Sequence, residues 1–235
     1  MAASSLELHA LELIDLIYGA ACDPALWPAF VERFLAAFPG TMFTVEILSR
    51  HPHFATRGAV ITSYPEEFGK TYLQHYCKMN PYLPLFSGMQ VGRIARLSNL
   101  MSPADVKKFP FYHEWLKPAG DFTYGPGAVL VRDEGRMLRA SIDIPDRIGD
   151  LEAPLARLLQ VLGPHLIRAF EVNDRLTTAT LQQQGLEGLI SRIDGAAFIV
   201  SAGGRLLQAN RSGERLLDEG TLVRQAGLGQ IVFQA

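Results

Sequence analysis

The sequence has little cysteine and no excess of charge of either sign. Cys22 and Cys77 are the only two cysteines in 235 residues, and they form no C-x-x-C pair. This excludes a disulfide-stapled secreted scaffold and favours a reducing, cytoplasmic setting. Lys and Arg total 22 against 24 Asp and Glu, a net charge of −2, which excludes a generally basic protein that coats nucleic acid.

Long hydrophobic runs are also missing. No window approaches the roughly 18 consecutive apolar residues of a membrane-spanning helix, so we expect no membrane partner. The small-residue run before Cys22 superficially resembles a lipoprotein cleavage site. However, Glu7, Glu12 and Asp15 interrupt the apolar stretch, and no Lys or Arg precedes it. The start of the chain therefore predicts an amphipathic helix and not a targeting signal.

The common motifs of enzymes are absent as well. There is no G-x-S-x-G elbow, no G-x-x-x-x-G-K-[ST] phosphate loop and no G-x-G-x-x-G, and His113-Glu114 lacks the second His of a zinc-binding helix. His51 and His53 are the only metal candidates, and Pro52 with no third ligand nearby favours a solvated turn. We predict no catalytic residue and no metal, and the sequence identifies no cofactor.

The first 148 residues combine helical and alternating patterns. Two amphipathic helices precede Pro39-Gly40, and two pairs of β-rich runs follow, at 42–62 and 122–145, with helices between them. Such an order predicts an α+β domain in which helices flank an antiparallel sheet.

A long connector helix is predicted next, over residues 149–185. From Leu151 to Ala179 apolar residues recur at alternating spacings of four and three, with only His165 polar. That repeat is typical of one helix packed along another, so we predict a homodimer in which Leu155, Leu158 and Leu162 pack across the axis. The alternative is that residues 186–235 cover this face.

The sequence pattern changes again in residues 186–235. A short helix, a hairpin around Gly203-Gly204, a helix capped by Asn210 and two short strand-like runs are expected, and the chain then stops at Ala235. This is interpreted as a partial domain of a truncated chain. Its five Arg balance five acidic residues, so it offers no basic patch for DNA.

Aromatic side chains concentrate between residues 64 and 124. Many carry a hydroxyl or an indole N–H, a combination that suits the lining of a small-molecule cavity. The alternative is that they form the ordinary core that covers a sheet.

Four short segments, in order, resemble LuxR-type transcriptional regulators. YPEEFGKTYLQHYCKMNPYL is similar to "Y-P-x-x-W-x-x-x-Y…Y…D-P" of their autoinducer-binding domains, and FPFYHEWLKPAG is similar to "F-Y-x-E-W-L-x-P-x-G". LGPHLIRAF resembles "L-x-P-H-L-x-R-A", and residues 195–217 resemble a PAS-like segment. The resemblance implies a GAF/PAS-like sensory domain over 1–148, the connector helix, and a partial PAS-like segment over 186–235. DNA binding would require a helix-turn-helix domain that is not present here.

The resemblance also implies a ligand site, at Tyr64, Phe68, Tyr72, Asn80 and Trp115. Phe68 stands where the autoinducer domains have a ligand-contacting Trp, and Asn80 stands where they have an Asp. These departures argue against an acyl-homoserine lactone as the ligand. We therefore predict the sensory and dimerising region of a cytoplasmic bacterial regulator with an unknown small-molecule effector. An interaction module without a ligand and, less favoured, an enzyme of unrecognised class are the alternatives.

Overall fold

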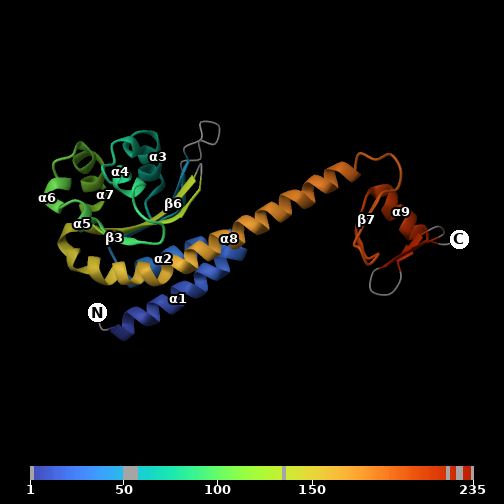
Figure 1. The fold of residues 1–235 in the computed structure, drawn as a ribbon, viewed down its shortest axis with the longest axis horizontal. Coiled ribbons are helices and arrows are strands. Elements are labelled where there is room, and N and C mark those ends of the chain that lie inside the picture. Colours follow the sequence, from blue (N-terminus) through green and yellow to red (C-terminus); the bar gives the residue numbers. More distant parts are fainter. Residues whose placement is uncertain (1–2, 50–57, 134–135, 221–222, 226–229, 234–235) are drawn as a thin grey trace. The chain divides into compact units, whose positions relative to one another are not determined.

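The computed structural model describes residues 3–49, 58–133, 136–220, 223–225 and 230–233. The chain divides into two compact units, Met1–Asn173 and Asp174–Ala235, which are described separately. Helices and antiparallel strands alternate in the order shown in Figure 1, and the predicted α+β class is confirmed. Among the described residues, no helix combines the length and apolar character needed to cross a bilayer.

The first unit opens with two helices, as predicted. α1 spans Ala3–Cys22, and a short 3-10 turn, η1 (Pro24–Leu26), leads into α2 (Trp27–Ala37). Asp23 caps the start of this turn, because its side chain accepts a hydrogen bond from the amide of Ala25 at 3.0 Å. The apolar faces of both helices are buried in one core.

An antiparallel sheet follows, with the strand order β2-β1-β6-β5-β3. Its strands are β1 (Met42–Ser49), β2 (Gly58–Thr62), β3 (Ile94–Arg96), β5 (Pro126–Arg132) and β6 (Arg136–Pro145), and β4 (Phe122–Tyr124) pairs with the end of β6. Both predicted hairpins are confirmed as paired strands, β1 with β2 and β5 with β6. The expected turn at His51 and His53 lies outside the described residues.

Short helices connect the strands and lie on one side of the sheet (Figure 1). They are α3 (Glu66–Gln74), η2 (Tyr76–Lys78), α4 (Tyr82–Ser87), α5 (Leu97–Leu100), α6 (Pro103–Val106), the π-helical turn η3 (Tyr112–Leu116) and α7 (Lys117–Gly120). The other side is covered by α1, α2 and the first part of the long helix α8 (Glu152–Ile190).

The two faces of the sheet differ sharply in polarity. On β1 and β6 every second residue is apolar, and Phe43, Val45 and Ile142 are fully buried with Phe30 and Phe34 of α2. In the middle of the two strands, the intervening positions are Thr44, Glu46, Arg139, Ser141 and Asp143. Because neighbouring side chains of a strand point to opposite faces, these polar residues line the side covered by α3 to α7.

The long helix α8 runs from Glu152 to Ile190, after the 3-10 segment η4 (Asp146–Leu151). It includes Pro164 without ending there, as expected. The prediction that a separate helix begins after Gly185 was wrong, since α8 continues through Gly185 and Gly188. An exposed glycine costs a helix only about 1 kcal/mol relative to alanine, too little to end one that both flanks support.

The expected dimer contacts in the first part of this helix are also corrected. Leu155, Leu158 and Leu162 are buried to 1% exposure or less in the core that their own unit forms with α1, α2 and the sheet. They are therefore not available to pack across a two-fold axis. His165, the polar residue of the seam, accepts or donates a hydrogen bond with the Tyr18 hydroxyl of α1 at 3.0 Å.

The second unit contains the end of α8 followed by two small hairpins and a helix. β7 (Phe198–Val200) pairs with β8 (Leu206–Ala209), α9 spans Arg211–Glu219, and β9 (Val223–Gln225) pairs with β10 (Ile231–Phe233). The buried Asn210 side chain accepts from the amides of Gly213 and Ala197. It also donates to the carbonyls of residues 190, 193 and 195, so it joins the hairpin to the end of α8. The cap predicted at Asn210 is confirmed.

Candidate functional site

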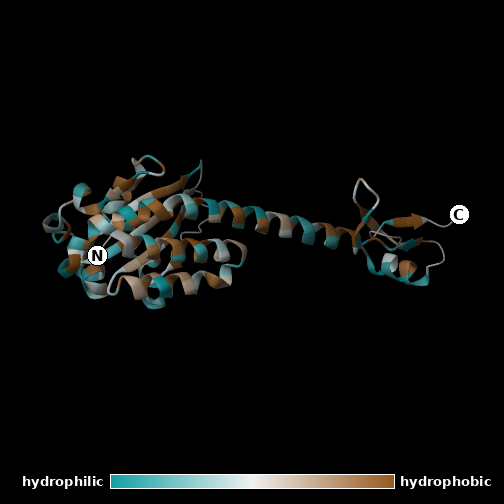
Figure 2. Ribbon diagram, turned by 90° about the horizontal axis from the view of Figure 1, so that it is seen from below, coloured by the Kyte–Doolittle hydropathy of each residue, from teal (hydrophilic) through white to brown (hydrophobic). Residues whose placement is uncertain are grey.

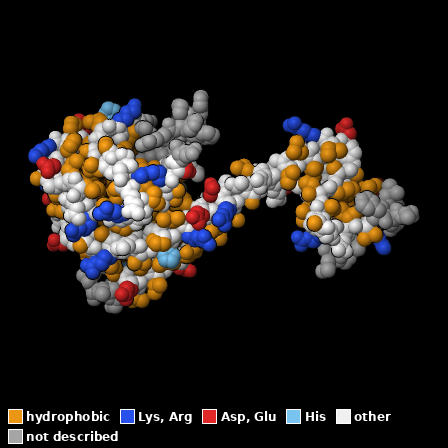
Figure 3. Space-filling model, in the orientation of Figure 1, with side chains coloured by type: hydrophobic (Ala, Val, Ile, Leu, Met, Phe, Trp, Pro, Cys, Tyr) orange, Lys and Arg blue, Asp and Glu red, His pale blue; other side chains and the backbone are white. Residues whose placement is uncertain are grey.

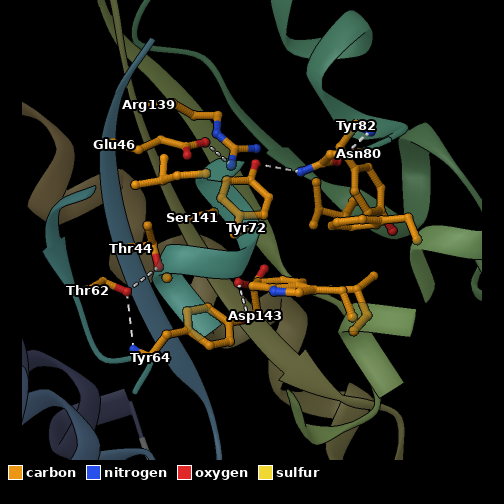
Figure 4. Close-up of a pocket in the computed structure, with 16 residues that line it drawn as sticks. Thr44, Glu46, Thr62, Tyr64, Tyr72, Asn80, Tyr82, Arg139, Ser141 and Asp143 are labelled. Carbon is orange, nitrogen blue, oxygen red and sulfur yellow. Dashed lines mark hydrogen bonds and ion pairs between the residues drawn. The ribbon is translucent and has the colours of Figure 1, made fainter. Parts of the chain in front are cut away.

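A cavity of about 60 Å³ lies between the polar face of the sheet and the helices over it (Figure 4). Its lining combines charged, hydroxyl-bearing and aromatic side chains and contains no His, Cys or Lys. The lining residues are Thr44, Glu46, Thr62, Tyr64, Gly69, Tyr72, Leu73, Asn80, Tyr82, Leu97, Phe111, Trp115, Leu116, Arg139, Ser141 and Asp143.

The sheet supplies the polar floor of the cavity. In the pairing of β1 with β6, Glu46 lies opposite Arg139 and Thr44 lies opposite Ser141. Directly opposed residues of an antiparallel pair bring their side chains into contact on one face. The strand register thus sets a buried ion pair beside two hydroxyl groups.

Glu46 and Arg139 form that ion pair, with exposures of only 3% and 7%. The Arg139 guanidinium also lies over the Phe86 ring, 4.6 Å from its centroid, which is a cation–π arrangement. Its Nε has no hydrogen-bond partner. A buried donor without a partner is uncommon, because an unmade hydrogen bond there destabilises the fold.

Asp143 is the second acid of the lining. It accepts a hydrogen bond from the Tyr64 hydroxyl at 2.8 Å through Oδ2. Loss of water around the carboxyl raises the pKa of Asp143 to about 6, with a further increase from Glu46, while the Tyr64 hydrogen bond and Arg139 oppose the increase. Burial and the same carboxylate raise the pKa of Tyr64 well above its ordinary value, so its hydroxyl stays protonated.

Asn80 connects two helices at the edge of the cavity. Its Nδ2 donates to the Tyr72 hydroxyl at 3.0 Å, and its Oδ1 accepts from the amide of Tyr82 at 2.9 Å. The residue therefore accepts from the first residue of α4 and holds the Tyr72 ring in place. The Tyr82 hydroxyl is buried without a hydrogen-bond partner.

Trp115, on the π-helical turn η3, closes the aromatic side. Its ring centroid lies 5.0 Å from those of both Tyr64 and Tyr72. Its Nε1 donates to the carbonyl of Phe68 at 3.3 Å. The Phe68 ring is partly buried beside Trp115, with centroids 6.4 Å apart, and does not line the cavity.

The structure thus brings Tyr64, Tyr72, Asn80 and Trp115 together around one cavity and leaves Phe68 behind Trp115. Whether these residues bind a ligand stays a prediction. The sequence interpretation missed the charged floor, formed by Glu46, Arg139 and Asp143. A signal was present, because MFTVEIL and RMLRASIDIP carry polar residues at alternate positions of predicted strands.

Nothing in the described part of the chain gathers three or more metal-ligating acid, His or Cys side chains. The lining offers instead hydrogen-bond donors, carboxylates and ring faces. Such groups orient and hold a small molecule.

A solved structure shares the fold over most of this chain. The structure of the VqsR LBD domain from Pseudomonas aeruginosa is similar with a TM-score of 0.53 and 16% identity, over 70% of this chain and 95% of that one. At this identity the similarity shows the fold alone. The structure of CepR2 from Burkholderia cenocepacia, an N-acylhomoserine lactone dependent LuxR family transcription factor, gives a TM-score of 0.42 and 16% identity, over 69% and 98%. No family model matches the chain, and no curated protein matches it.

Proposed function

We propose that residues 1–173 are the small-molecule-sensing unit of a bacterial transcriptional regulator. The observation that carries the proposal is the buried polar cavity, in which Arg139 Nε and the Tyr82 hydroxyl have no protein partner. An ordinary core would fill this space with apolar side chains, because polar groups buried without partners are destabilising. The LuxR-type motifs and the fold shared with the VqsR LBD domain support the same assignment.

Two other functions remain as alternatives. An interaction module without a ligand would not need unpartnered polar atoms behind a wall of aromatic rings. For an enzyme, the carboxylate of Asp143 could act as a general base, but the described lining residues supply no His, Cys or Lys beside it as a nucleophile or second proton carrier.

The test is capture of a small molecule by the purified protein. Native mass spectrometry of the whole chain is expected to show a bound species that is lost on denaturation. Gly69 gives a matched pair of variants, because it lines the cavity and a Cβ added there meets no atom within 4 Å. Gly69→Leu should reduce the bound fraction at least fivefold, whereas Gly69→Ala should retain it. A protein that carries nothing and binds no member of a metabolite library would overturn the proposal.

We further propose that the chain dimerises through the exposed part of α8 that follows Asn173. Residues 174–189 are all exposed, and Val172, Leu176, Ala179, Gln183, Leu186 and Ile190 continue the spacing of four and three. Leu176 and Leu186 are 45% and 48% exposed. Figure 2 shows hydrophobic residues interspersed along this stretch of the helix, and Figure 3 shows several of their side chains at the surface.

A second copy of this helix fits that face best. A repeat alternating four and three keeps one stripe in contact with a parallel partner of the same repeat, which is the geometry of a two-stranded coiled coil. Gln183, at a core position of the repeat, would fix the register of the pair, as a single polar residue does there. The dimer therefore uses the part of the helix after Asn173 and not the buried leucines before it.

A further inference from the structure

The charges around the cavity do not balance. Glu46, Arg139 and Asp143 are the only charged residues of the lining, two acids against one base. Arg139 is paired with Glu46 across β1 and β6. Asp143 accepts a hydrogen bond from Tyr64 through Oδ2, and it shares with Glu46 the electrostatic influence of Arg139. Among the described residues of the lining, the acids therefore exceed the bases by one negative charge.

Two buried hydrogen-bond donors lie in the same lining as the carboxylate of Asp143. Among the described residues, Arg139 Nε and the Tyr82 hydroxyl are buried donors without a hydrogen-bond partner, in residues that are 7% and 5% exposed. The acceptor Glu46 Oε1 also lacks a hydrogen bond, but it faces Arg139 in the ion pair. Figure 4 shows the Arg139 guanidinium directed in among the other lining residues, beside the Tyr72 ring. Tyr82 lies near enough to Asp143 for that carboxylate to raise the pKa of its hydroxyl, together with burial, the larger cause, and Glu152. An acceptor and two donors thus surround one space.

We infer that the cavity takes a small protonated amine that carries an oxygen acceptor next to the amine. The ammonium group would lie at Asp143 and supply the missing positive charge, and the oxygen would accept from Tyr82 or Arg139. This inference rests on the proposed sensing function and names the chemical class of its ligand. A charge-assisted hydrogen bond is about twice as strong as a neutral one, so the amine is the larger determinant of selectivity.

The volume of the cavity also favours a small ligand. Its volume of about 60 Å³ is far below the roughly 300–1,000 Å³ of drug-sized ligand pockets. An extended acyl chain would require the rings of Tyr72 and Trp115 to separate. A polar molecule of about five heavy atoms needs a much smaller adjustment.

Three probes of nearly equal size separate the contributions. Glycinamide has an amine and a carbonyl oxygen, propionamide replaces the amine by a methyl group, and butylamine keeps the amine without the oxygen. At pH 7.0 an amine of the α-amino type is mostly protonated, since its ordinary pKa is about 8. Dissociation constants of the whole chain for each probe would be measured by calorimetry or ligand-observed NMR, at up to about 100 mM probe because fragments of this size bind weakly.

Glycinamide is expected to bind at least tenfold tighter than both other probes. Asp143→Asn should bring glycinamide to the level of propionamide, because the amide still accepts from Tyr64 but carries no charge. Tyr82→Phe should weaken glycinamide binding several-fold, towards the level of butylamine, without lowering the melting temperature of the free protein, since the hydroxyl has no partner among the described residues to lose. Asp150→Asn removes an exposed acid outside the cavity and should leave the tenfold preference intact.

Equal or tighter binding of propionamide would overturn the inference while leaving a neutral-ligand sensor in place. A tenfold preference that survives Asp143→Asn would also overturn it, because the amine would then bind elsewhere. Absence of binding by all three probes overturns the ligand class, and the capture experiment then decides separately whether the unit senses another molecule.

Discussion

Asp143 affects the stability of the fold as well as the character of the cavity. Its folded-state pKa is about 6, raised from an ordinary value of 3.8. Between about pH 4 and pH 6, the Asp143 carboxyl is therefore protonated to a greater extent in the folded chain than in the unfolded chain. Stability is greatest, with respect to this group, below pH 4 and declines as the pH rises through 6.

Asp143→Asn is expected to raise the free energy of unfolding of the first unit at pH 7.5 by about 1–2 kcal/mol, because it removes a poorly solvated charge. The difference in the free energy of unfolding between Asp143→Asn and the wild type should shrink towards zero at pH 4.5. Urea denaturation followed by tryptophan fluorescence measures this unit alone, since both tryptophans, Trp27 and Trp115, lie in it. A variant less stable than the wild type at pH 7.5 would contradict the assigned protonation.

Asn80 bears on the choice of ligand. In the structure it presents an N–H group to Tyr72, where an aspartate would present only an acceptor. We expect a panel of acyl-homoserine lactones to leave the melting temperature unchanged. A true ligand at 100 times its dissociation constant would stabilise the native state by about 2.7 kcal/mol, a change easily measured in a melting scan. A clear upward shift would mean that Asn80 substitutes for the carboxylate.

Single residues of the site were only partly predictable. Tyr64, Tyr72, Asn80 and Trp115 could be selected because short motifs and helical spacing mark them. Glu46 and Arg139 escaped because a charged residue in a strand ordinarily faces water. Their burial depends on helices that enter the fold some 20 to 60 residues away in the sequence, and no local pattern reports that.

Among the elements, α8 is fixed at its start by one buried carboxylate. Glu152 is 5% exposed, and its Oε1 accepts from the amides of Ser98 and Gly125, each at 3.1 Å, while its Oε2 accepts from the Ser98 hydroxyl. It thereby joins the helix to α5 and to the turn between β4 and β5. Gly125 is required in that turn, since an added Cβ would lie 1.9 Å from the carbonyl oxygen of Ile142.

Glu152→Ala is expected to lower the free energy of unfolding of the first unit by about 2–4 kcal/mol, because it leaves two backbone N–H groups without an acceptor. Glu152→Gln retains an oxygen for those amides and should cost only about 1 kcal/mol. Denaturation curves recorded by tryptophan fluorescence compare the three proteins. Equal losses in both variants would show that the charge, and not the acceptor, holds the helix.

Most helices and strands could be predicted from the sequence, but what packs against the apolar face of α8 could not. A spacing of four and three describes any helix that packs lengthwise, whether the neighbour belongs to the same chain or to another. Before Asn173 the neighbour is the unit's own core, and Leu158 is 1% exposed there. Only the three-dimensional fold separates that segment from the exposed one that follows.

At the scale of the whole molecule, the proposed dimer gives a paired prediction. Leu186→Glu places a charge on the exposed face of α8 and should convert a dimer into a monomer in light scattering, with the fluorescence melt unchanged. Leu158→Glu should instead destabilise the first unit by at least about 3 kcal/mol, because an unpaired charge enters the core. Leu11→Glu, at a leucine of α1 that is 66% exposed, is the control and should remain dimeric.

If light scattering shows that the wild type is a monomer, the proposed dimer is wrong. A dimer that tolerates Leu186→Glu and dissociates with Leu11→Glu would place the interface on α1 instead.

The division of the sheet into an apolar and a polar face also restricts how the chain can fold. If β1 slipped by one residue against β6, Glu46 would turn towards Phe30 and Phe34, and Val45 would turn towards the polar helices. A sheet paired in the wrong register would thus be destabilised, because it would bury the charged Glu46 and Arg139 side chains, which line the cavity, in the apolar core. An apolar substitution of both would remove this penalty on mispairing, whereas substitutions on the overlying helices, at positions such as Gly69 and Tyr82, would leave the strand register unchanged.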